Sequence, residues 1–318
     1  MMAGIVQDEE YVVAEEALDP ISARQGNGAS PTFGLALGGG GARGLAHIHA
    51  IEALDELGIR PAVISGSSIG ALMGAGMAAG MTGAEIRDHA YSILSSRAEV
   101  VSRVWRSRPA SLSQMVEGGL RLGQFSPERV IAAFLPHSIP DRFEALQIPL
   151  RVTATDYYGH HLAVFESGEL LSALAASAAL PAVFRPVQRD GRTLIDGGIY
   201  NPVPFDLLEG MVDVVIAVDV VGAPTVRTAK MPSAIEMMFG ATQLMMQSII
   251  SMKLQNTRPD ILLRPAVSRF RVLDFLKINA ILDETSGIKD ELKRAIERAI
   301  ESRQLNPPAH AGHGGDQP

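Results

Sequence analysis

Three short segments of the sequence carry residue types that could do chemistry together. A glycine run, GGGGARG, occupies 38–44, the pentapeptide GSSIG has Ser68 at its centre, and Asp196 is followed directly by two glycines. A serine hydroxyl needs a base to become a nucleophile, and main-chain N–H groups can stabilise the oxyanion that its attack creates. The three segments could therefore supply a nucleophile, a base and an anion-binding loop.

The glycine run is compatible with three kinds of anion: a dinucleotide pyrophosphate, a nucleotide triphosphate or a catalytic oxyanion. Residues 39–44 fit the dinucleotide pattern G-x-G-x-x-G, but the next strand ends at Ser65 with no acidic residue nearby. A triphosphate loop would need Lys followed by Ser or Thr after its last glycine, where this chain has Leu45 and Ala46. The oxyanion is the remaining interpretation.

Ser68 lies between an apolar run and a helical pattern. This strand–turn–helix context of G-x-S-x-G lifts a serine onto a tight, exposed turn, and Gly66 and Gly70 leave room for it. The alternative is that Ser67 or Ser68 only caps the helix.

The base is less evident. A triad would place a histidine after the serine, but none of the available histidines has a convincing setting: His137, His160 and His161 downstream, and His47 and His49 upstream. Asp196 ends a short apolar strand, and Gly197 and Gly198 let the chain turn beneath it, although an Asp-Gly pair can also be only a turn. Asp156 and Asp219 also end strands, and we interpret them as turn or cap residues.

In their order and spacing, these motifs resemble the patatin-like phospholipases, a family of serine lipid acyl hydrolases. The family signatures G-G-G-x-[KR]-G, G-x-S-x-G and D-G-[AG] correspond to 39–44, 66–70 and 196–198, and the resemblance covers about 33–210. It implies a Ser–Asp dyad without histidine, in which Ser68 is the nucleophile and Asp196 the base. It also implies an oxyanion hole and a set of supporting glycines: Gly39, Gly40, Gly41 and Arg43 for the hole, and Gly44, Gly66, Gly70, Gly197 and Gly198 for support.

The expected substrate is a phospholipid or lysophospholipid, with no metal and no cofactor. An esterase or thioesterase for soluble acyl substrates and a non-catalytic lipid-binding module remain as alternatives. The resemblance implies a three-layer α/β/α sandwich with a mainly parallel sheet. The residues themselves favour the same class, because short apolar runs alternate with helical patterns. The expected strands are Phe33–Leu37, Ala62–Ser65, Leu150–Thr155, Val183–Val187, Asp213–Val220 and Asp260–Leu263.

A helix is expected after the glycine run. Ala46, Ala50, Ala53, Leu54 and Leu57 form its apolar stripe, and Gly58 stands where a C-terminal cap would. Its opposite stripe is polar and consists of His49, Glu52, Asp55 and Glu56.

Composition limits the remaining possibilities. The 318 residues carry a net charge of −7, which disfavours nucleic acid as a partner, and they contain no cysteine. We expect a disordered acidic tail over 1–31, one catalytic domain over 32–305 and a second tail over 306–318. The N-terminus lacks the pattern of a secretory signal, and the longest apolar stretch, 69–81, is shorter than a membrane span, so a cytoplasmic location is expected.

Two segments raise the question of membrane contact. Residues 235–254 form an apolar helical pattern with five methionines, suited to a core or homodimer helix and also to an acyl channel or a membrane surface. Residues 97–108 place four arginines, Arg97, Arg103, Arg106 and Arg108, around Trp105. Such a segment could contact anionic lipid head groups at the periphery of a membrane or be an ordinary solvated helix.

Overall fold

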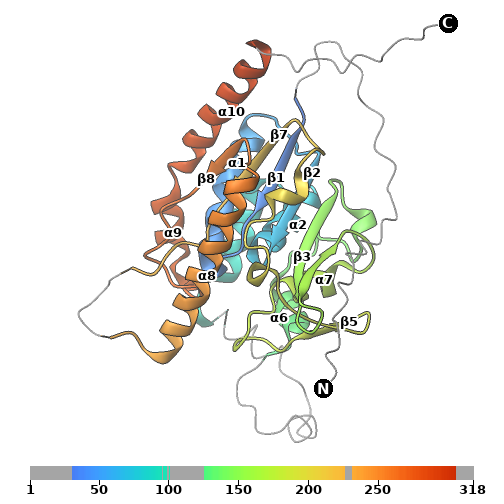
Figure 1. The fold of residues 1–318 in the computed structure, drawn as a ribbon, viewed down its shortest axis with the longest axis vertical. Helices are drawn as coiled ribbons and strands as arrows, with labels where there is room; N and C mark the ends of the chain where they lie inside the picture. Colours follow the sequence, from blue (N-terminus) through green and yellow to red (C-terminus); the bar gives the residue numbers. More distant parts are fainter. Residues whose placement is uncertain (1–30, 95, 99, 101–124, 226–230, 306–318) are drawn as a thin grey trace, which may run out of the picture. The chain divides into compact units, whose positions relative to one another are not determined.

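An eight-stranded sheet lies at the centre of the computed structural model, which describes residues 31–94, 96–98, 100, 125–225 and 231–305 (Figure 1). The strands are β1 (Phe33–Leu37), β2 (Val63–Ser67), β3 (Leu150–Asp156), β4 (His161–Phe165), β5 (Val187–Arg189), β6 (Arg192–Asp196), β7 (Val214–Val218) and β8 (Ile261–Leu263).

The α-helices within these residues are α1 (His47–Glu56), α2 (Ile69–Ala78), α3 (Gly83–Leu94), α6 (Pro127–Phe134), α7 (Leu170–Ser177), α8 (Ala234–Asn256), α9 (Ile278–Thr285) and α10 (Ile288–Leu305). Short 3-10 helices are η1 (Gly41–Ala46), η2 (Phe143–Ala145), η3 (Gly197–Ile199), η4 (Phe205–Leu208) and η5 (Phe275–Lys277). No helix of the described ranges has the length and hydropathy needed to cross a membrane.

The strand order is β5-β6-β3-β2-β1-β7-β8, with β4 on the other edge of β3. The five strands β3-β2-β1-β7-β8, which are neighbours in this order, are parallel to one another. Strands β4, β5 and β6 are antiparallel to their neighbours. The parallel strands therefore end at one common edge, called here the catalytic edge because the glycine run, Ser68 and Asp196 all follow or end strands there.

Alternation along the strands divides the core between two faces of the sheet. On β7, Ile216 packs into a large cluster with α1, α2, α7, α9 and α10, whereas Val215 and Ala217 pack into a smaller cluster with η4 and α8. In Figure 1, α8 crosses in front of the sheet and α2 lies behind it. The expected three-layer α/β/α sandwich with a mainly parallel sheet is confirmed.

The predicted strand Val183–Val187 is wrong over most of its length, because β5 starts only at Val187. The N–H groups of Val183 and Phe184 both donate to the carbonyl of Leu180, so the chain turns there, and Pro186 has no N–H to give to a ladder. The predicted strand Phe33–Leu37 is present with the predicted bounds, and the other predicted strands are present with ends shifted by one or two residues. Gly58 caps α1 with a positive φ of 66°.

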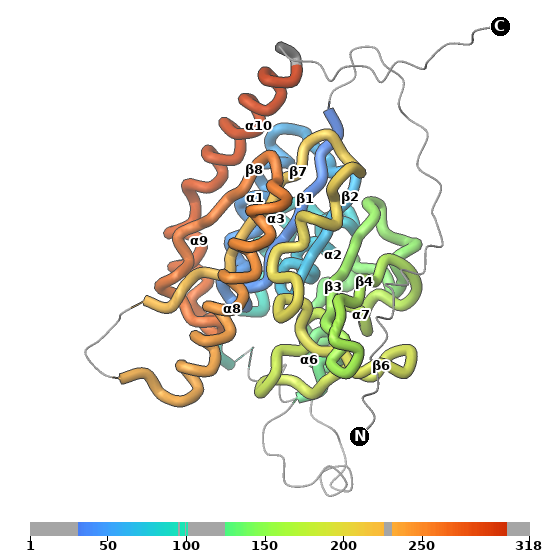
Figure 2. Tube along the Cα trace, viewed as in Figure 1, coloured from blue at the N-terminus to red at the C-terminus, as the bar shows by residue number. Residues whose placement is uncertain are grey.

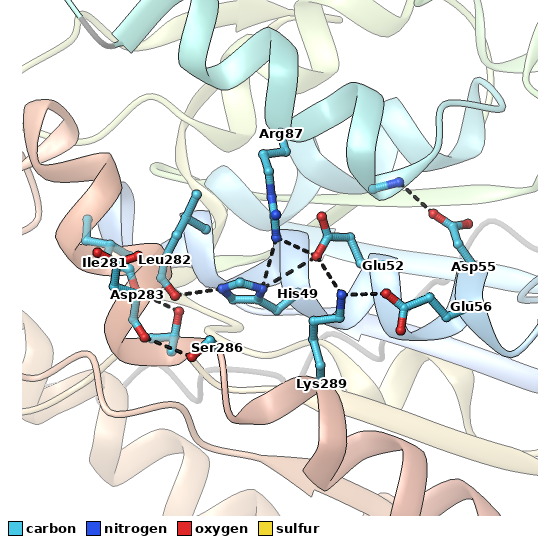
Figure 3. A network of polar contacts seen from close by, with 12 residues as sticks. His49, Glu52, Asp55, Glu56, Arg87, Ile281, Leu282, Asp283, Ser286 and Lys289 are labelled. Atoms are coloured by element: carbon cyan, nitrogen blue, oxygen red, sulfur yellow. Dashed lines mark hydrogen bonds and ion pairs between the residues drawn. The ribbon is translucent and has the colours of Figure 1, made fainter.

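The polar stripe of α1 faces solvent only in part. His49 and Glu52 are buried, because α3, α9 and α10 pack across this side of the helix (Figure 3). The Glu52 carboxylate pairs with Arg87 of α3 and Lys289 of α10, and His49 Nε2 donates to the carbonyl oxygen of Leu282. Ion pairs and hydrogen bonds within the protein thus satisfy the buried part of the stripe, whereas Glu56 at its end is exposed.

Helix α8 is also not a core helix, since Ile250 is its one buried residue. Arg103, Trp105, Arg106 and Arg108 of the basic segment lie outside the described residues. So do 1–30 of the expected N-terminal tail and all of 306–318.

Candidate active site

Strand register brings Ser68 and Asp196 together. On β3, Thr153 pairs with Ser67 at the end of β2, and the next residue, Ala154, pairs with Asp196 at the end of β6. Because β4 occupies the other edge of β3, β6 takes over the edge that β2 has just left. Two residues that are 128 positions apart in sequence thereby become neighbours.

Ser68 lies on a strained turn between β2 and α2. Its φ of 54° and ψ of −124° are rare for a residue with a side chain, and such strain is often retained at functional sites. The turn depends on close backbone approach, because a Cβ at Gly70 would lie 2.1 Å from the carbonyl oxygen of Leu37. A Cβ on any of the other supporting glycines would also meet a neighbouring atom within 3.0 Å: Gly44, Gly66, Gly197 and Gly198.

The hydroxyl of Ser68 donates a hydrogen bond to Oδ2 of Asp196 at 2.6 Å. The other carboxylate oxygen, Oδ1, accepts the N–H of Gly198 at 2.8 Å, so the turn that follows Asp196 also orients its side chain. On the serine side, the N–H of Ser68 donates to Oγ of Ser177 in α7 at 2.8 Å. Asp196 is thus oriented by its bond from Gly198, and Ser68 by its bond to Ser177.

Burial changes the acidity of Asp196. Removal from water raises the pKa of its carboxyl from 3.8 to about 6, although the hydrogen bonds from Ser68 and Gly198 work in the opposite direction. A carboxylate with this pKa is a stronger base than one in water, and it is still ionised at neutral pH.

The glycine run contributes different groups at successive positions. Gly39 packs against Ser68, but its N–H already donates to the carbonyl of Pro202 at 2.9 Å, so it cannot also donate to an oxyanion. Among the described residues, the N–H groups of Gly40 and Gly41 have no such main-chain acceptor. Gly41 needs to be glycine, since its φ is 59° and a Cβ would lie 2.2 Å from the oxygen of Val272.

Arg43 orients this loop from inside the protein. Arg43 is 2% exposed, and its Nε donates to the carbonyl oxygen of Gly40 at 3.0 Å. In a trans peptide the C=O and the following N–H point in opposite directions, so this bond also fixes the direction of the Gly41 N–H. Arg43 therefore acts on the loop through its backbone.

Sequence reasoning missed three side chains around the pair. Ser177 is one of two serines in the apolar helix α7 and the one of them that is buried, so a serine within this apolar segment was the signal that could have identified it. Ser67 is fully buried, and its hydroxyl has no hydrogen-bond partner in the described part of the chain. Met246 of α8 reaches the Asp-Gly-Gly turn, with Cε 3.0 Å from where a Cβ of Gly198 would be.

The histidines and the other two strand-end aspartates form no hydrogen bond with the side chain of Ser68 or of Asp196 in the described part of the chain. His137, His160 and His161 are exposed, and His47 donates through Nε2 to the carbonyl of Gly38, while burial lowers its pKa to about 4. Asp156 accepts the N–H of Gly159, as expected for a turn residue, and Asp219 accepts the N–H of Val221 and pairs with Arg264. No cluster of His, Asp and Glu suited to a metal ion occurs in the described ranges.

Known proteins share this sequence pattern. An uncharacterized NTE family protein of Mycobacterium tuberculosis is 34% identical over 205 residues, 64% of this chain and 53% of that protein. Human patatin-like phospholipase domain-containing protein 6 is 32% identical over 197 residues, 59% of this chain and 13% of that protein. The chain thus spans about half the length of the mycobacterial relative.

Solved structures resemble the fold more distantly. Human GIVD cytosolic phospholipase A2 gives a TM-score of 0.46 at 12% identity, over 86% of this chain and 63% of that one. VipD from Legionella pneumophila gives 0.42 at 16% identity, over 82% and 67%. The sequence profile described as "Patatin-like phospholipase" matches residues 35–209, more than half of the chain. The chain belongs to the patatin-like phospholipase family.

Proposed function

We propose that the protein is a serine hydrolase that cleaves carboxylic esters of phospholipids or lysophospholipids, with Ser68 as nucleophile and Asp196 as general base. The observation that carries this proposal is the 2.6 Å hydrogen bond from Ser68 Oγ to a buried carboxylate whose pKa is raised to about 6. Membership of a family of lipid hydrolases supports it.

The proposed reaction has two halves. Ser68 Oγ attacks the carbonyl carbon of the ester while its proton passes to Asp196 Oδ2. Collapse of the tetrahedral intermediate breaks the ester C–O bond, and Asp196 returns the proton to the leaving alcohol. Water then attacks the acyl-serine, giving its proton to Asp196, which passes it back to Ser68 as the fatty acid leaves.

The oxyanion of each intermediate would be stabilised by main-chain groups. The available donors are the N–H groups of Gly40 and Gly41. The positive end of the dipole of α2, a helix that begins directly after Ser68, adds to the stabilisation. One well-placed donor is worth about 3 kcal/mol of barrier. These donors compensate for the modest basicity of a carboxylate.

The test combines labelling with mutation. A fluorophosphonate probe should label the wild-type protein at Ser68, and Ser68→Ala and Asp196→Asn should each reduce hydrolysis of a short-chain ester by at least a thousandfold. Ser177→Ala, which removes a supporting acceptor but neither reacting group, should retain measurable activity. Full esterase activity in both dyad variants would refute the proposal.

A second comparison separates lipids from soluble acyl substrates. An enzyme for lipids should hydrolyse a lysophospholipid faster once micelles form, whereas an esterase or thioesterase for soluble substrates should show no such increase. Binding of micelles with no labelling of Ser68 would instead indicate a non-catalytic lipid-binding module.

A further inference from the structure

Helix α8 projects beyond the catalytic edge of the sheet. It connects the parallel strands β7 and β8, so it runs antiparallel to them and begins at the edge where they end. Its 23 residues span about 34 Å, whereas the five residues of β7 span about 17 Å. The N-terminal turns of the helix consequently extend past the strand ends (Figure 2).

The exposed apolar side chains of α8 are concentrated in this projecting part. Before and within its first thirteen residues, six large apolar side chains are exposed: Met231, Ile235, Met237, Met238, Leu244 and Met245. Beyond Met246, Met252 is the one large apolar side chain of the helix that is exposed. Polar residues are exposed around it, among them Ser248, Ser251 and Gln255. The apolar surface thus fades with distance from the catalytic edge.

The opposite face of α8 is fixed to the body of the protein. Gln243 and Gln247 donate to the carbonyl oxygens of Val221 and Gly222, just beyond β7. Near the other end, Lys253 donates to the carbonyl oxygen of Val203 at 2.9 Å. The helix is therefore held in a position that leaves its apolar side outward.

This apolar surface is continuous with the site. Met246 is partly buried between the exposed methionines and the turn after Asp196, where it approaches Gly198. An acyl chain bound at Ser68 would therefore lie near the side chain of Met246, and methionine adapts to irregular apolar shapes.

A second exposed apolar group lies at the same edge. Tyr157 and Tyr158 follow directly on β3 and are 54% and 74% exposed, with their rings packed edge to face at 4.9 Å. Tyrosines with an apolar ring and a polar hydroxyl are favoured where a protein meets the boundary between water and lipid. Their position places the two groups on either side of the dyad along the sheet.

We propose that these two groups, the six exposed side chains of the α8 N-terminal half and the Tyr157–Tyr158 pair, form one docking surface for a phospholipid bilayer. This inference rests on the proposed function, since the docking surface would place the dyad over the lipid that supplies the ester. Glu236 is the one charged residue in 231–252, and its carboxylate forms an ion pair with Arg271. The docking is therefore driven by apolar burial, and it does not require anionic lipid.

The distribution along α8 favours a bilayer over a second copy of the chain. A helix-to-helix dimer would cover the outer face over its length, Met252 included. A bilayer that meets the catalytic edge would cover the projecting N-terminal half and leave Met252, about a dozen residues further along, in water. Substitutions in the N-terminal half of α8 and at Met252 therefore discriminate between a bilayer and a second copy of the chain.

The test measures binding of the full chain to vesicles of ether-linked phosphatidylcholine, which has no carboxylic ester to hydrolyse. Sedimentation should recover wild-type protein with the vesicles equally in low and high salt. Met238→Glu combined with Met245→Glu should reduce the partition coefficient at least tenfold. The matched control is Met252→Glu on the same helix, 54% exposed against 60% for Met245, and it should stay within twofold of wild type.

A combined Tyr157→Ser and Tyr158→Ser variant should also bind at least fivefold more weakly. Thermal unfolding checks that each variant is folded, and Met237→Lys serves as a single exposed change if the double variant does not fold. Equal loss in Met252→Glu and in the double variant, with a dimer-to-monomer change in light scattering, would overturn the proposal in favour of a second copy. Unchanged binding in the double variant, or binding that needs anionic lipid, would also overturn it.

Hydrolysis of a short-chain monomeric ester is measured in parallel. The Met238/Met245 variant and the Tyr157/Tyr158 variant should keep wild-type rates on this substrate, because the substituted residues lie outside the dyad. If the wild-type protein hydrolyses no ester but the binding pattern is as expected, the docking surface stands and the proposed hydrolase function fails.

Discussion

The carboxylate of Asp196 accepts the Ser68 hydroxyl at 2.6 Å in a place where burial holds the pKa of the carboxyl near 6. The proposed base acts only when ionised, so kcat/KM should be constant above about pH 7 and fall tenfold per pH unit well below pH 6. The measurement is hydrolysis of a short-chain ester between pH 4 and 9, with circular dichroism to show that the fold persists. A fall in kcat/KM with its midpoint at pH 4 would mean that the ionised base is not this buried carboxyl.

The same burial should cost stability. Since the folded pKa of Asp196 exceeds the unfolded value, the folded state binds the proton more tightly, and stability falls as pH rises from about 4 to about 6. The loss is complete above pH 6 and amounts to at most about 3 kcal/mol. Asp196→Asn should therefore raise the free energy of unfolding at pH 7.5 and have little effect at pH 4.

Urea unfolding at both pH values checks this expectation. Asp190→Asn is the control, because the side chain of Asp190 is 66% exposed and the substitution removes no carboxylate from a buried place. It should change the free energy of unfolding by no more than about 1 kcal/mol at either pH. Equal stabilisation by Asp196→Asn at pH 4 and pH 7.5 would show that the effect does not come from ionisation.

The sequence allowed most of the strand positions and the three motif turns to be predicted, because both depend on local signals. Apolar runs identify buried strands, and glycines identify places where backbones approach closely. The contact between Ser68 and Asp196 was inferred only from a resemblance. Its physical origin is the register of β3 with both β2 and β6, which depends on pairing across the sheet and leaves no local trace.

Side-chain surroundings were harder to predict for the same reason. Glu52 belongs to a polar stripe whose composition suits solvent, and only the packing of α3 and α10 buries it. Gly39 fits the loop signature, but Pro202 from a distant segment takes its N–H. The apolar composition of α8 suggested a core or contact helix, and its exposure follows from the projection past the sheet.

Arg43 should affect turnover through the loop backbone. Loss of its bond to the Gly40 carbonyl frees the peptide that carries the Gly41 N–H, a group proposed to act only on the transition state. Arg43→Lys, which lacks the rigid planar fork of donors, should lower kcat about 10- to 100-fold and leave KM within twofold. Steady-state kinetics with a short-chain ester measures both parameters.

A control variant separates this effect from a general loss of positive charge. Arg264→Lys alters an arginine that pairs with Asp219 at the end of β7 and is half exposed, so kcat should stay near the wild-type value. An unchanged kcat in folded Arg43→Lys would show that the glycine loop keeps its orientation without the guanidinium.

Glu52 and Glu56 offer a paired test of how burial changes the contribution of an ion pair. Both carboxylates face Lys289 from the same side of α1, but the side chain of Glu52 is 9% exposed and that of Glu56 is 44% exposed (Figure 3). Glu52→Ala leaves Arg87 and Lys289 without their buried partner, so it should lower the free energy of unfolding by about 3–5 kcal/mol. Glu56→Ala should lower it by no more than about 1 kcal/mol.

Urea unfolding at pH 7, in low salt and in 1 M salt, distinguishes the two positions. The small effect of Glu56→Ala should shrink further in 1 M salt, because solvent ions screen an exposed pair. The effect of Glu52→Ala should persist, since the side chain of Glu52 is only 9% exposed in the folded state and solvent ions screen a largely buried charge much less. Similar, salt-sensitive losses in both variants would mean that Glu52 is solvated in solution and that α3 and α10 do not close over α1.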